Sequence, residues 1–218
     1  MPHHHNHEHS HYHIHSNERS TRIVVFISFV TMLLELYYGY AANSKTLIME
    51  GWHMLSHVLV LLLAWGAYFY IKQKHGAITH EQQHRVISLA GFASAVVMLV
   101  VTVSMIYETL YRFMDLQVEV SIEAFAVAFI GLVVNGLSAY FLHREEEKWD
   151  INMQAAYLHV LSDVVISLFA IVALIAAKYF DFKILDSILA IVGALVILRW
   201  AMGLIHKSWN EVLGRQST

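Results

Sequence analysis

The stretch INMQAAYLHVLSDVVISLFAIVALIAAK, residues 151–178, is apolar for most of its length yet contains His159 and Asp163 four positions apart. A second apolar run nearer the N-terminus repeats this spacing with His53 and His57, and both segments follow the pattern H-x-L-S-[HD]-V. Runs of this length predict helices that cross a membrane. Residues four apart lie on one face of a helix, about 6 Å apart along its axis.

Composition places the chain among membrane proteins with several spans. Its 218 residues are 57% hydrophobic, and its mean hydropathy of +0.52 is too high for an ordinary soluble domain. The formal net charge of -3 gives no basic surface for nucleic acid. Because the chain has no cysteine, it forms no disulfide, and a metal site must use nitrogen and oxygen ligands.

The fold class that follows is an all-α membrane protein with six transmembrane helices in one domain, residues 21–213. Each apolar stretch is long enough to cross about 30 Å of hydrocarbon, and the stretches are residues 22–42, 46–71, 85–111, 119–142, 151–178 and 185–207. With both termini in the cytoplasm, ten of the 14 Lys and Arg residues lie on the inner side. This excess fits the positive-inside rule.

Residues 1–20 differ from the rest of the chain. They are polar and include eight of its 16 histidines: His3, His4, His5, His7, His9, His11, His13 and His15. Residues such as Asn6 and Glu8 interrupt the run, unlike in a cloning tag. The segment is too polar to bury a core, so we expect a disordered cytoplasmic tail that offers accessory metal ligands.

The two spaced pairs predict one intramembrane metal site. In the expected topology the second and fifth helices are antiparallel, so His53 would face Asp163 and His57 would face His159. Ionisable side chains are expensive inside a membrane and mark functional sites. Three imidazoles and one carboxylate suit a transition metal better than Mg²⁺ or Ca²⁺. The alternative is that these residues are interior polar groups that hold helices together.

Three more polar residues are candidates for supporting or gating this site. Glu50 precedes His53 by three residues and therefore shares roughly the same helix face. Glu35 lies in the first apolar stretch and Asn43 follows it. Helix packing is an equally good explanation for Glu50 and a better one for the other two.

The segment Asn152 to Asp163 resembles the fifth helix of the cation diffusion facilitator family, and the resemblance covers about residues 20–213. Other positions that fit the family are Glu35, Gly39, Asn43, Glu108, Gly131, Asn135 and Asp186. The resemblance implies a bacterial inner-membrane homodimer, a secondary transporter rather than an enzyme, that exports divalent metals in exchange for protons. It also implies that His53, His57, His159 and Asp163 form the transport site.

Two departures from the family pattern bear on function. Many zinc-transporting members have Asp where this chain has His57, and the segment Gly51-Trp52-His53-Met54 is similar to the divalent-metal-efflux (DmeF-like) branch. That branch is associated with cobalt, nickel or iron, so the expected substrates are Zn, Cd, Co, Ni or Fe, with no organic cofactor. The chain also ends soon after the sixth helix, and we expect the usual C-terminal cytosolic domain to be missing.

The leading functional hypothesis is a metal/proton antiporter that works by alternating access. Three other classes remain open. Paired intramembrane histidines also suit a haem-binding electron-transfer protein, and a membrane metalloenzyme would use Glu50 as its base. A metal-buffering membrane protein would need only the histidine-rich tail.

Overall fold

A computed structural model describes residues 7–41, 45–74, 77–112, 122–143, 149–182 and 184–213. These residues form α1 (His7–Ala41), α2 (Lys45–Gln73), α3 (His80–Arg112), α4 (Ile122–His143), α5 (Ile151–Phe180) and α6 (Ile184–Val212). Each helix contains a segment that is long and apolar enough to cross a membrane. The six predicted spans are therefore confirmed, with helix ends that extend a few residues beyond several of them.

The first helix begins earlier than the first apolar stretch. α1 begins at His7, so residues 7–20 are helical, whereas residues 1–6 lie outside the described part. Extending an existing helix costs far less than nucleating one, because each added residue gains a hydrogen bond. Asn17, Glu18 and Thr21 are also buried against the bundle, which ties the start of the span down.

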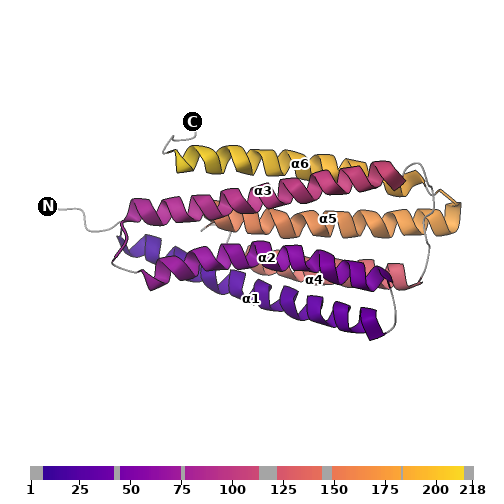
Figure 1. Ribbon diagram of the computed structural model, residues 1–218, viewed down its shortest axis with the longest axis horizontal. Coiled ribbons are helices and arrows are strands. Elements are labelled where there is room, and N and C mark those ends of the chain that lie inside the picture. The colour runs from indigo at the N-terminus through magenta and orange to yellow at the C-terminus, as the bar shows by residue number, and fades with distance from the viewer. Residues whose placement is uncertain are drawn as a thin grey trace.

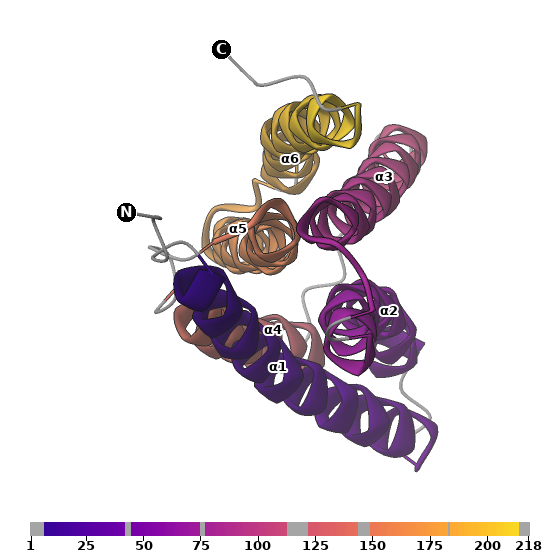
Figure 2. The same cartoon turned by 90° about the vertical axis from the view of Figure 1, so that its left-hand side faces the viewer.

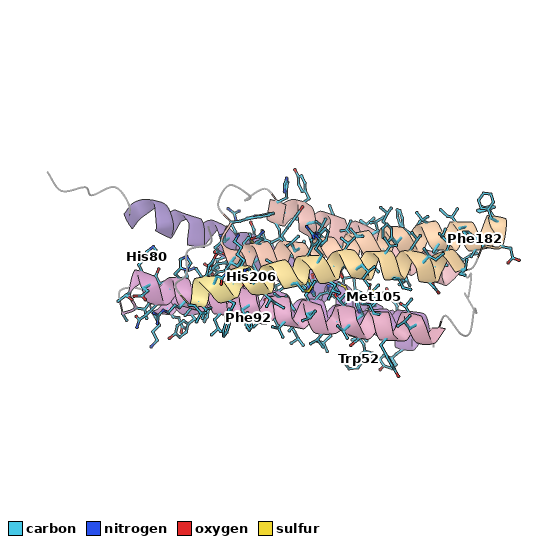
Figure 3. The ribbon with its side chains drawn as sticks, turned by 90° about the horizontal axis from the view of Figure 1, so that it is seen from above. Trp52, His80, Phe92, Met105, Phe182 and His206 are labelled. Atoms are coloured by element: carbon cyan, nitrogen blue, oxygen red, sulfur yellow. The ribbon has the colours of Figure 1, made fainter. Side chains whose placement is uncertain are left out.

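The helices run alternately up and down in an elongated bundle (Figure 1). α1 and α3 begin at the same end at which α6 ends, and we call this the inner end. Viewed along the bundle, α3 and α6 form a pair on one side, α1, α2 and α4 lie on the other, and α5 lies between them (Figure 2). Figure 3 shows His80 and His206 toward the inner end and Trp52 and Phe182 toward the opposite, outer end.

The tightly packed core occupies the inner half of the bundle. Eight of the ten buried residues of α5 lie between Ile151 and Ser162, and the other two are Ala173 and Ala177. In the inner half, Tyr68 of α2 packs with residues of α3, α5 and α6, and Leu61 packs with residues of α1, α4 and α5. The six helices therefore pack most tightly in the inner half of the bundle, where the first half of α5 lies.

Gly91 sets how closely α3 approaches the start of α5. A Cβ at this position would lie 3.1 Å from the backbone oxygen of Ile151. We expect Gly91→Val to lower the free energy of unfolding by about 1–3 kcal/mol, because a backbone atom has no rotamer by which to move away. Thermal unfolding in detergent measures this, with Gly136→Val as the control, since no atom beyond its own stretch of helix lies within 4 Å of a Cβ there. Equal shifts in Tm for the two variants would contradict the close approach.

Candidate metal centre

α2 and α5 bring their spaced pairs together in the interior of the bundle. Each pair lies within an unbroken helix, so both of its side chains leave the same face. His57 and His159 are each only 3% exposed. Asp163 is 17% exposed, and His53, one turn nearer the outer end, is exposed. The site is therefore sealed at His57 and His159 and more open at His53.

His57 is the central residue of the cluster. Its Nδ1 atom lies 2.8 Å from Oδ2 of Asp163. Its ring centroid lies 4.8 Å from the centroids of both His53 and His159. His57 thus contacts Asp163 as well as His159, the residue that the antiparallel arrangement predicted.

Three of the four residues already cluster as metal ligands would. Single ligand atoms from His53, His57 and Asp163 all lie within 4.8 Å of one another. Metal–ligand bonds of about 2.0–2.2 Å in a tetrahedral site separate the ligand atoms by roughly 3.3 Å. Binding a metal between His57 and Asp163 therefore requires these two side chains to separate by less than about 1 Å.

His159 is close to this trio but is not part of it. Among the described residues, neither of its ring nitrogens has a hydrogen-bond partner, and both are buried. Burying a polar group without a partner is costly. A turn of the His159 ring toward His57 would add a fourth nitrogen or oxygen ligand and satisfy one of these atoms.

The supporting residues expected from sequence are placed only in part. Glu35 is buried in α1, near the level at which Met32 packs with Met54 and Val58 of α2. Asn43 lies outside the described residues, and Glu50 lies in α2 but its side chain is not described. Of the tail histidines, His3, His4 and His5 lie outside the described part, and the other five lie in α1 with side chains that are not described.

A polar network at the inner end was not predicted. The Tyr68 hydroxyl donates to Asp150, at 2.8 Å from Oδ1 and 3.0 Å from Oδ2. Asn17 donates to the same carboxylate at 3.3 Å, and so does the backbone N–H of Met153 at 2.8 Å. Asp150 is also the N-cap of α5. One carboxylate therefore joins α1, α2 and α5, and we call Asn17, Tyr68 and Asp150 the inner network.

Two further contacts strengthen the same end. Asn152 donates to the backbone oxygen of Ala64 at 3.0 Å, and Lys72 pairs with Glu18 at 3.0 Å.

Burial raises the pKa of the Asp150 carboxyl, while the hydrogen bonds that it accepts oppose this rise. The Asp before an apolar run was a recognisable cap signal, but its partners 82 and 133 residues away had no local signal.

Comparison with known proteins identifies the family. Residues 21–213 match the sequence model of the cation efflux transmembrane domain. The chain belongs to the cation efflux family. This is the cation diffusion facilitator family, whose fifth helix the segment Asn152 to Asp163 resembles.

Named relatives in this family are bacterial transporters. The zinc transporter ZitB of Pectobacterium atrosepticum is 32% identical over 90% of this chain and 62% of its own length. ZitB of Escherichia coli is 32% identical over 98% of this chain and 68% of its own length. A cadmium, cobalt and zinc/H(+)-K(+) antiporter of Bacillus subtilis is 30% identical over 84% of this chain and 60% of its own length. The chain thus spans roughly two thirds of the length of these cation efflux proteins.

The helices and the bacterial relatives together give the cellular location of the protein. Six membrane-spanning helices and bacterial relatives make it a multi-pass protein of the bacterial inner membrane. The site formed by α2 and α5 therefore lies within the membrane-spanning part of the chain.

Proposed function

We propose that this protein carries divalent transition-metal ions out of the cytoplasm in exchange for protons, with His53, His57, His159 and Asp163 as the ligands of the transported ion. The observation that carries the proposal is the convergence of ligand atoms from His53, His57 and Asp163 within 4.8 Å. This convergence occurs inside six membrane-spanning helices of a cation efflux protein. The names of the zinc and the cadmium, cobalt and zinc relatives support the same substrate class.

The contact between His57 and Asp163 supports proton coupling. Nδ1 of His57 and Oδ2 of Asp163 lie 2.8 Å apart but are not aligned for a hydrogen bond, so each atom is open to a proton or a metal ion. A metal ion needs both atoms as unprotonated lone-pair donors, so its binding releases any proton held there. Returning protons would displace the ion in turn. The site therefore exchanges its two cargoes by competition for the same atoms.

Alternating access requires a path that closes on one side of the site while it opens on the other. The inner network and the packed inner half of α5 support a conformation that is closed at the inner end. The exposed His53 lies on the outer side of His57. With both termini in the cytoplasm, as the charge distribution predicts, this conformation would face outward.

Ligand chemistry limits the substrate to a class. Imidazole nitrogens with one carboxylate suit Zn, Cd, Co, Ni or Fe better than hard cations. His57 is the residue that makes the chain similar to the branch associated with cobalt, nickel or iron. That the protein transports one of these metals stays a prediction. The homodimer that the family resemblance implies also stays a prediction.

The haem hypothesis fits this geometry less well. A porphyrin between two axial histidines must separate their rings, and the rings of His57 and His159 lie only 4.8 Å apart. Asp163 would also have no role in such a site, although it contacts His57 directly.

Deleting residues 1–16 tests whether the protein is a transporter or a metal buffer. This deletion removes all eight tail histidines but keeps Asn17 and Glu18, which contact Asp150 and Lys72. We expect the truncated protein to keep its maximal rate of metal uptake into proteoliposomes and to need a higher metal concentration for half that rate. Uptake assays over a range of Zn²⁺ and Co²⁺ concentrations measure both quantities.

The control for this deletion is the full-length chain with His57→Ala. That variant keeps the tail but loses the central residue of the cluster, so its uptake should fall to the level of empty vesicles. The reverse pattern, in which the truncated protein binds no metal and the His57 variant binds as well as wild type, would establish a buffer.

A further inference from the structure

A groove lies between α5 and α6. Its volume is about 580 Å³, within the range of small-ligand sites. The residues that line it include Gln154, Leu158, Arg199, Met202 and Lys207. Two of these side chains are cationic and none is acidic, so the groove favours an anion.

Arg199 is the unexplained residue of this groove. It lies about 20 Å along α6 from Asp186. With Asp186 at the outer boundary of a 30 Å hydrocarbon layer, Arg199 would lie about 10 Å inside the inner boundary. A charge at that depth is expensive unless it is paired. Among the described residues Arg199 has no ion pair, and its side chain is exposed.

Lys207 marks the membrane boundary of the same groove. It lies eight residues beyond Arg199, about 12 Å closer to the inner end. Its ammonium donates to the neutral oxygen of Gln154 at 2.8 Å, and among the described residues it forms no ion pair with a carboxylate. A long Arg side chain extends toward the interface, and Arg199 would therefore direct its guanidinium toward Lys207.

We propose that this groove binds the phosphate of an anionic phospholipid from the inner leaflet, held by Arg199 and Lys207. Basic pockets between membrane helices on the cytoplasmic side are suited to anionic headgroups. The guanidinium of Arg199 matches two phosphate oxygens. Leu158 and Met202 supply apolar surface for the start of an acyl chain.

The position of the groove links lipid binding to α5. Leu158 lines the groove, and the next residue, His159, is buried on the bundle side of the same helix. A lipid wedged between α5 and α6 would therefore contact the segment that carries two proposed ligands. The lipid site itself does not depend on the proposed transport function.

Native mass spectrometry of the full chain tests the site. The protein is taken from vesicles with equal amounts of phosphatidylglycerol and phosphatidylcholine, and the lipids that stay bound are counted. Two cations near a membrane surface predict a roughly 10- to 30-fold preference for phosphatidylglycerol. The double variant R199Q/K207Q should lose this preference, and R199K/K207R, which keeps both charges, should retain most of it.

The matched control is K74Q/R85Q, which removes one Lys and one Arg from exposed positions near the inner end but outside the groove. It should bind phosphatidylglycerol as wild type does. The proposal is overturned if wild type shows no preference, or if K74Q/R85Q loses it as fully as R199Q/K207Q does. Complete displacement of the lipid by inorganic phosphate would identify a small anion as the ligand and would also overturn it.

Discussion

Asp163→Ala is expected to abolish metal uptake by the protein in proteoliposomes. Asp163 is the only carboxylate among the four proposed ligands and lies 2.8 Å from His57. Replacing a residue that merely supports a ligand lowers metal affinity about 10- to 100-fold, so losing a ligand should lower uptake by more than about 100-fold at limiting metal.

The fold should survive this change, because His57 needs no counter-charge when it is neutral. Asp163→Asn keeps the shape of the side chain and serves as the isosteric variant, with the same expected loss of uptake. Glu81→Gln is the control, since Glu81 is an exposed carboxylate paired with Arg85 near the inner end. Thermal unfolding of each variant separates misfolding from loss of transport. A well-folded Asp163→Ala protein with wild-type uptake would remove Asp163 from the site.

The second large effect is expected at the inner network. Tyr68→Phe removes one hydroxyl that donates to both oxygens of Asp150. A hydrogen bond to a charged group contributes about 1.5–3 kcal/mol, so its loss should increase the population open at the inner end by roughly 10- to 100-fold. Asp150→Ala, which also removes the contact with Asn17, should have a larger effect.

The absence of native cysteines makes this opening directly measurable. A single Ala64→Cys reporter lies on the same face of α2 as His57 and Tyr68 and is fully buried in this structure. A membrane-impermeant maleimide is added to each side of oriented vesicles in turn. Labelling from the inner side should become faster in Tyr68→Phe by the factor given above.

Tyr70→Phe is the matched control, because Tyr70 lies two residues away with its side chain exposed. Its labelling rate should equal that of the reporter alone. Equal rates in the Tyr68 and Tyr70 variants would show that the inner network does not hold the bundle closed.

The bundle was predictable because hydropathy and length alone decide whether a helix crosses a membrane. The start of α1 was not, because residues 7–20 are polar and their helix depends on its continuation into the span and on contacts of Asn17 and Glu18. Hydropathy gives no information about such partners. The disordered cytoplasmic tail expected for residues 1–20 stays a prediction, although α1 begins at His7.

The site was predictable to the level of helix faces. Spacing of four placed His53 with His57 and His159 with Asp163, and antiparallel helices brought the pairs together. The direct contact of His57 with Asp163 depends on the register between α2 and α5, which local sequence does not specify. The inner network escaped prediction for the same reason, since Tyr68 and Asp150 are 82 residues apart.

The central claim is that metal and protons exchange through one site, and simultaneous recording of both ions in proteoliposomes tests it most directly. Metal uptake and internal pH are followed with wild-type protein after a proton gradient is imposed across the membrane. We predict that the gradient alone drives Zn²⁺ or Co²⁺ inward as protons leave, and that both fluxes vanish together in Asp163→Ala. Metal uptake that is unaffected by the gradient, or that proceeds without proton movement, would contradict the account.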